Sequence, residues 1–365
     1  MDALHNMMAE QGSMWLAAGG LLLGLAFGAV VFRTNYCAMG SLADIHNFGD
    51  YRRFRAWILA AAVALVGAQL LQRTGVVALE RSMYLGASIN WFGDIVGGLI
   101  FGFGMVFAGG CPSRNLARAG SGDIRALITL VVVGIVAYMT IGGLFAPVRA
   151  RLEQATSLTP FRTQTQSIAD IASAATGFGT AQIGALLTVL IAGAATVYCL
   201  GDARFRKSPI HLFSGLAVGL IVVAGWALTG LTFDDMAVKP VPPISLTFVR
   251  PAGDTLEWLE RYTAGPLPGF GASTVIGAIV GAFATALAMG RFQVATYSDV
   301  GDTVRNLSGA ALMGIGGVMA MGCTVGQAIT GVSTLALGSF LAFASIVAGG
   351  FYGLRVLERQ ILAAA

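Results

Sequence analysis

Long apolar runs constrain most strongly what this chain can fold into. A helix that spans a bilayer needs about 20 predominantly apolar residues. Nine runs of that kind lie near residues 14–32, 56–72, 92–109, 125–145, 182–200, 211–231, 273–290, 306–322 and 334–354. Charged residues make up only 11% of the chain, against roughly 25% in soluble domains. We therefore expect an all-α polytopic membrane protein, one domain over residues 1–365, with about nine transmembrane helices.

One short motif occurs twice, each time between two apolar runs. Phe107-Ala-Gly-Gly-Cys111-Pro112-Ser-Arg114-Asn115 returns 212 residues later as Met319-Ala-Met-Gly-Cys323-Thr324-Val-Gly-Gln327. Paired breaks in two halves are typical of transporters that bind substrate between discontinuous helices. The approximate repeats are expected at 14–145 and 211–354, joined by a helix at 182–200. With nine spans, the two pseudo-symmetric halves would be inverted.

The residues of each motif predict a short re-entrant half-helix. Gly110 would end one helix, Cys111 would lie near the next N-cap, and Pro112 suits the first helical position because its missing N–H is not needed there. Gly322, Cys323 and Thr324 can form the same arrangement without the proline. Exposed amides and the positive dipole end at such a break attract anions.

A thiol in this position is a specific chemical choice. Cysteine is a weak S–H donor and a soft, polarizable contact. It suits a sulfur-bearing anion such as thiosulfate better than a hard phosphate or sulfate; sulfide, polysulfide and selenium analogues also fit. Cys37 follows the first span and opens a possible short helix, so a site role and simple packing both remain open. Cys199 ends a span without a break and is expected to be a packing residue.

Polar residues near the cysteines allow more than one role. Asn115 and Gln327 each follow a cysteine by four residues, so they can hydrogen-bond to substrate or tie the half-helix to a neighbour. Arg114 and Arg118 can attract anions, although ordinary loop charge explains them better. A cluster before the eighth span is favoured as a solvated loop or salt bridge over an ion-coupling site; it consists of Asp299, Asp302 and Arg305.

The charge pattern also predicts orientation and excludes several classes of function. Lys and Arg in short loops place the N-terminus outside and the C-terminus in the cytoplasm. The long connections 146–181 and 232–272 then lie outside. Three histidines and four cysteines without a CxxC pair argue against a metal site or a thioredoxin-like motif. No cofactor and no nucleic-acid partner are expected.

On Gly110-Cys111 and Gly322-Cys323-Thr324, the chain resembles the YeeE/YedE family of bacterial sulfur transport proteins. The resemblance implies thiosulfate uptake across the inner membrane, with Cys111 and Cys323 as thiols that contact substrate. It also implies a small cytoplasmic sulfur-carrier protein of the TusA type as a partner. Pro112 departs from the family's usual Gly-Cys-Thr and removes a hydroxyl, and some members are linked to selenium, so a selenium species is an alternative substrate.

The sequence as a whole therefore predicts a permease for thiosulfate or a similar small sulfur anion, and not an enzyme. Cys111 and Cys323 would be successive binding sites, with Cys37 a possible third. Three alternatives remain. One is a transporter of another sulfur or selenium species. The second is a membrane thiol–disulfide oxidoreductase, which would need two thiols close enough to exchange. The third is a water- or metal-conducting channel or a structural membrane subunit.

Overall fold

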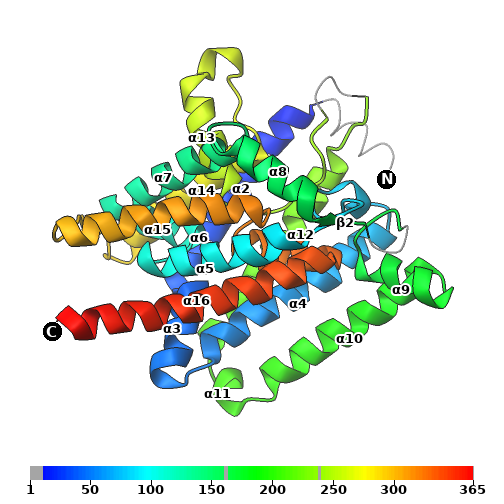
Figure 1. The fold of residues 1–365 in the computed structure, drawn as a ribbon, viewed down its shortest axis with the longest axis horizontal. Helices are drawn as coiled ribbons and strands as arrows, with labels where there is room; N and C mark the ends of the chain where they lie inside the picture. Colours follow the sequence, from blue (N-terminus) through cyan, green and yellow to red (C-terminus); the bar gives the residue numbers. More distant parts are fainter. Residues whose placement is uncertain (1–10, 160–162, 237–239, 365) are drawn as a thin grey trace.

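The computed structural model describes residues 11–159, 163–236 and 240–364, and most of them are helical (Figure 1). The prediction that the N-terminus lies on the outer side of the membrane concerns residues that precede the described range. All nine predicted segments lie in helices. These are α2 (Gly12–Thr34), α4 (Arg52–Arg73), α5 (Gly98–Phe107), α7 (Ile124–Ile141), α10 (Thr180–Leu200), α12 (Pro209–Leu231), α14 (Phe270–Ala288), α15 (Val300–Met319) and α16 (Leu337–Ala364).

Shorter elements connect these helices. The α-helical ones are α3 (Ala38–Phe48), α6 (Pro112–Gly120), α8 (Ala146–Thr156), α9 (Ile168–Thr176), α11 (Ala203–Arg206) and α13 (Arg250–Glu260). π-helical turns form η2 (Gly93–Gly97) and η4 (Gly326–Gly331), and 3₁₀ turns form η1 (Leu79–Arg81), η3 (Tyr262–Ala264) and η5 (Val332–Thr334). The two-residue strands β1 (Ile89–Asn90) and β2 (Ser157–Leu158) pair antiparallel, with Ile89 opposite Leu158.

Eight helical stretches of the described residues are long and apolar enough to cross a bilayer. They include two longer units, Gly12–Phe48 and Gly93–Gly120, each of which contains a break and a short second helix. The predicted eighth segment forms α15, which starts with a polar turn and is not among the eight. In Figure 1, α15 lies beside α5. The chain is a multi-pass, all-α membrane protein, as predicted.

The packing partners of the two predicted halves are reciprocal. Helix α2 packs on α14 and α12 packs on α4; likewise α5 packs on α16 and α15 packs on α7. The contacts are close because the helices meet at glycines. A Cβ at Gly28 would lie 2.0 Å from the carbonyl oxygen of Ala278, so a side chain there would push α2 and α14 apart. Reciprocal pairs are what a two-fold relation between halves produces, and the inverted arrangement itself stays a prediction.

The connection 232–272 is not simply an external loop. Its segment before α13 is extended and enters the core, where Leu246 and Phe248 are fully buried. Side chains of neighbouring elements satisfy part of its backbone. Thr330 donates to the carbonyl of Leu246 at 2.7 Å, and Thr229 donates to that of Ile244 at 2.7 Å. Non-helical backbone at membrane depth is tolerated in this way, buried within protein.

Candidate functional site

The first break lies between α5 and α6 and depends on two glycines. Gly109 has a φ of 71° and Gly110 a φ of 148°, values that residues with a side chain rarely adopt. The amide of Gly110 donates to the carbonyl of Met105 at 2.8 Å and so closes the end of α5. Cys111 is the N-cap of α6, and Pro112 is its first residue. The predicted half-helix is confirmed as α6.

Side chains of α6 and α15 satisfy the carbonyl groups that this break leaves open. The bonds run from Asn306 Nδ2 to Ala108 (3.0 Å), from Arg118 Nη1 to Gly109 (2.9 Å) and from Asn115 Nδ2 to Gly110 (2.8 Å). Backbone inside a bilayer needs such partners because water is absent there. The break is therefore a fixed structural feature, held partly by the other half of the chain.

The second break repeats the backbone hydrogen bonds of the first. The amide of Gly322 donates to the carbonyl of Gly317 at 2.7 Å, as that of Gly110 does to Met105. The amide of Gln327 donates to the carbonyl of Cys323 at 2.7 Å. The motif that recurs in the sequence thus recurs in backbone structure.

The short helix after Cys323 differs in kind from α6. It is η4, in π geometry, followed by the 3₁₀ turn η5. Met321, with a φ of 53°, takes the left-handed position that Gly109 takes in the first copy. No proline starts the helix here, and the carbonyl of Thr324 accepts a hydrogen bond from Trp57 Nε1 at 3.3 Å. The second copy therefore keeps the break without the regular α-helix.

Cys37 opens a third short helix, which its sequence context left open. It is the N-cap of α3, and its Sγ accepts a hydrogen bond from the amide of Gly40 at 3.2 Å. The same contact, three residues on, joins Cys323 Sγ to the amide of Gly326 at 3.4 Å. Cys37 and Cys111 are therefore the N-caps of short helices, whereas Cys323 lies two residues before the N-cap of η4, Val325.

The three thiols lie near one another, with Cys111 in the middle. Cys111 is close enough to interact electrostatically with both Cys37 and Cys323. All three are buried and free, and Cys111 and Cys323 have no exposed surface. The structure brings the three predicted cysteines together inside the helix bundle, shielded from solvent.

Three buried hydroxyl groups beside the cysteines have no hydrogen-bond partner among the described residues: Tyr36 Oη, Tyr84 Oη and Thr324 Oγ1. Tyr36 interacts electrostatically with Cys37 and Cys111, and Tyr84 with Cys323. An unsatisfied buried polar group costs about 1–3 kcal/mol. The site therefore offers thiol and hydroxyl donors that a small anion can satisfy.

The two arginines after Cys111 have different surroundings. Arg118 donates to Asp123 Oδ2 at 2.6 and 3.0 Å and supports the break. Arg114 is partly buried, has no carboxylate within ion-pair distance in the described part of the chain, and interacts electrostatically with Cys37 and Cys111. Arg118 is thus structural, whereas the charge of Arg114 is available to an anion at the thiols.

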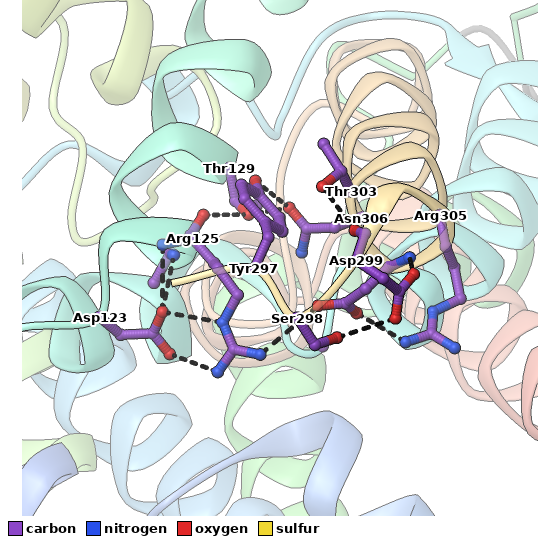
Figure 2. A network of polar contacts seen from close by, with 12 residues as sticks. Asp123, Arg125, Thr129, Tyr297, Ser298, Asp299, Thr303, Arg305 and Asn306 are labelled. Carbon is purple, nitrogen blue, oxygen red and sulfur yellow. Dashed lines mark hydrogen bonds and ion pairs between the residues drawn. The ribbon is translucent and has the colours of Figure 1, made fainter. Parts of the chain in front are cut away.

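The network in Figure 2 fixes the first break to α15. Arg125, at the start of α7, lies between Asp123 at 3.2 Å and Asp302 at 3.6 Å. Asp302 also pairs with Arg305 at 2.7 Å, so the charged cluster at the start of α15 contains ion pairs, as the sequence favoured. Asn306, which holds the Ala108 carbonyl, accepts hydrogen bonds from Thr129 (2.8 Å) and Tyr297 (3.0 Å).

The amide side chains predicted to support the site hold the two breaks. Asn115 donates to the carbonyl groups of Gly110 and Cys111, and Gln327 donates to that of Ala320. Their oxygens, Oδ1 and Oε1, have no partner among the described residues. The side-chain nitrogens of Asn115 and Gln327 therefore hydrogen-bond to the backbone of the two breaks.

Cys199 has the packing role that the sequence predicted. It has no exposed surface, and its Sγ donates to the carbonyl of Arg55 at 3.2 Å. Sequence reasoning missed Tyr36 and Tyr84, because their proximity to the thiols depends on tertiary structure. It also missed Asp94, a fully buried carboxyl at the start of the third span. The sequence signal that could have identified Asp94 is a single carboxyl residue within an apolar run.

Three known relatives and one family resemble this chain. The model of the sulphur transport family matches residues 33–352. The thiosulfate transporter TsuA of Spirochaeta thermophila is 28% identical over 358 residues, covering 93% of this chain and 99% of that protein. TsuA of Escherichia coli is 27% identical over 335 residues, covering 85% and 86%. The probable transporter YedE of Salmonella typhimurium is 31% identical over 107 residues, covering 29% and 24%.

Proposed function

Since this chain belongs to the sulphur transport family, we propose that it is an inner-membrane permease that imports thiosulfate or a closely related small sulfur anion. The full-length relatives named as thiosulfate transporters support this choice of substrate. The substrate would cross without covalent change. A TusA-type sulfur carrier would receive it in the cytoplasm, where we also place the C-terminus.

The convergence of three thiols and three unpartnered hydroxyls carries the proposal. An anion that leaves water for a low-dielectric pore must exchange its hydration for protein donors. Cys37, Cys111 and Cys323 offer soft S–H donors in a row, and Arg114 adds a positive charge at one end. We infer that the anion passes from thiol to thiol along this row. Cys111, which neighbours both of the others, is the central site.

We also propose that the two breaks belong to inverted halves at 14–145 and 211–354. Their matching backbone hydrogen bonds and the reciprocal helix packing support this arrangement. Two such breaks facing one site would let each half open toward one side of the membrane in turn.

Uptake of radiolabelled thiosulfate into liposomes that contain the purified protein tests the proposed function. We expect uptake above that of empty liposomes, inhibited by unlabelled thiosulfate and not by sulfate. Uptake equal to that of empty liposomes would overturn the assignment. Stronger inhibition by selenium or polysulfide anions than by thiosulfate would support the permease assignment and identify a different substrate.

A further inference from the structure

The carboxyl group of Asp94 has no role in the site described so far. Asp94 lies in η2, at the beginning of the third span, and has no exposed surface. Neither of its oxygens has a hydrogen-bond partner among the described residues. Burying an ionisable side chain within a membrane protein costs free energy, so such a residue is a candidate for a functional role. The groups around Asp94 indicate which role.

A second unpartnered oxygen lies beside this carboxyl. A Cβ at Gly338, in the first turn of α16, would lie 2.5 Å from Oδ2 of Asp94 and 2.9 Å from Oε1 of Gln166. Gln166 is also buried, and its Oε1 has no partner in the described part of the chain. Its Nε2 donates to the carbonyl of Tyr84 at 2.8 Å, which fixes the amide so that the oxygen faces this space.

No charge compensates Asp94 within the described residues. No charged group of the described segments lies close enough to its carboxyl to interact with it electrostatically, and α5 carries no titratable residue. Arg149 and Glu153 of α8, near Gly93, pair with each other at 2.7 Å. The remaining titratable groups on the surrounding elements are Tyr84, Asp170 of α9, Asp302 and Arg305 at the far end of α15, and Tyr352, Arg355, Glu358 and Arg359 in the second half of α16.

Two unpartnered acceptor oxygens that border the same glycine, without a nearby cation in the described ranges, fit a bound proton. An ionised Asp94 would be an uncompensated buried charge. Protonation removes the charge and lets the carboxyl O–H donate a hydrogen bond to Oε1 of Gln166. A hard metal ion needs six or more oxygen ligands, and the described residues include no group of three His, Cys, Asp or Glu that could hold a metal.

The carboxyl is connected to the thiol site through α16. Gly338 touches Asp94, and the next residue, Ser339, lies beside Gly331 of η4. A Cβ at Gly331 would also lie 2.7 Å from Oε1 of Gln327, whose backbone bonds to Cys323. The first turn of α16 therefore separates the carboxyl from the second break by one layer of residues.

We propose that Asp94 is a proton-binding site that couples proton movement to anion import. This proposal rests on the proposed function. In each cycle Asp94 takes one proton from the outside solution and releases it to the cytoplasm as the anion crosses. No other bond changes. An inside-negative potential of 100 mV lowers the inside-to-outside concentration ratio that an anion can reach by about fiftyfold for each negative charge imported. One proton carried with each dianion halves the net charge that must cross.

An infrared pH titration of the purified protein tests the proton site without reference to transport. We expect a protonated-carboxyl band in wild type that titrates with pH and is missing in Asp94→Asn. The band should persist in Asp254→Asn, a control that removes a carboxyl outside the spans. Gln166→Met should shift the titration to lower pH, because the proton loses its acceptor. A wild-type spectrum without a band that depends on Asp94 would overturn the proposal.

Transport in liposomes tests the coupling, with the membrane potential held at zero. An outside pH one unit below the inside should raise thiosulfate accumulation by up to about tenfold for one proton per cycle. In Asp94→Asn the ratio of accumulation with and without the gradient should fall to one, whatever the basal rate. Wild-type accumulation that ignores the gradient would contradict coupling. If wild type carries no thiosulfate at all, the proposed function fails, and the infrared titration still decides the proton site.

Discussion

The break before Cys111 and the break before Cys323 have the same backbone hydrogen bonds but different neighbours. Arg114 and Arg118 border the first, and Arg118 belongs to the ion-pair network that reaches α15. Indole rings border the second: Trp57 donates to Thr324, and Trp226 donates to Ser333 at 3.0 Å. A repeated frame thus presents one thiol in charged surroundings and the other in neutral ones. We expect the first to hold the anion more strongly than the second.

Removing either thiol should have the largest effect on transport. A hydrogen bond to a charged group is worth about 1.5–3 kcal/mol, so Cys111→Ala and Cys323→Ala should each lower the initial rate of thiosulfate uptake by about tenfold or more. Cys199→Ala is the matched control, because that thiol donates only to the Arg55 carbonyl. Wild-type rates in either variant, at equal amounts of protein in the membrane, would make these cysteines packing residues.

Alanine in place of the glycine before each cysteine should separate the two breaks by stability. Gly110 has a φ of 148°, so Gly110→Ala should cost about 1–3 kcal/mol of folding free energy. Gly322 has ordinary φ, and a Cβ there would lie 3.2 Å from both Cγ and the backbone nitrogen of Gln327, contacts that a shift of a few tenths of an ångström relieves. Gly322→Ala should therefore cost less. Melting temperatures in detergent compare the two, and equal losses would show that the first break needs no special backbone.

Neutralising Arg114 should weaken anion binding with little loss of stability. We expect Arg114→Gln to raise the KM for thiosulfate roughly fivefold, with little dependence on salt because partly buried charges are weakly screened. Arg114→Lys retains the charge and should recover most of the affinity. An unchanged KM in Arg114→Gln would show that the charge of Arg114 does not contribute to anion binding at the first site.

Acid should weaken the network at the first break by a small amount. Burial acts to raise the pKa of Asp123, but the hydrogen bonds of Arg125 and the charge of Arg118 hold that pKa below its ordinary value. The stabilisation is therefore present above the ordinary carboxyl pKa of about 4 and is lost as the pH falls through the lowered one. Asp123→Asn should melt slightly below wild type at pH 7, and the two curves should converge in acid. A gap that stays constant with pH would refute this assignment.

Local patterns in the sequence predicted the helices and the two breaks. Apolar runs of span length determine the helices, and glycine before Cys111 determines where α5 must end. The contacts of the site depend on residues far apart in the chain. Tyr84 meets Cys323, and Gln166 meets Asp94, only because the tertiary packing brings them together.

The buried segment before α13 was missed for a related reason. Ser245-Leu-Thr-Phe248-Val is too short for a span and lies in a connection that carries several charges. Its burial follows from partners on other helices, such as Thr229 and Thr330. A sequence pattern that looks only at neighbouring residues cannot reveal such partners.

Protection of the thiols by substrate is the most direct test of the central claim, that Cys111 and Cys323 contact the transported anion. The purified protein would be treated with a small alkylating reagent, and the modification of each cysteine would be followed by mass spectrometry. We predict that thiosulfate changes the rate of alkylation at Cys111 and Cys323, that sulfate does not, and that Cys199 is indifferent to both. Equal rates at Cys111 and Cys323 with and without saturating thiosulfate would contradict a pathway lined by these thiols.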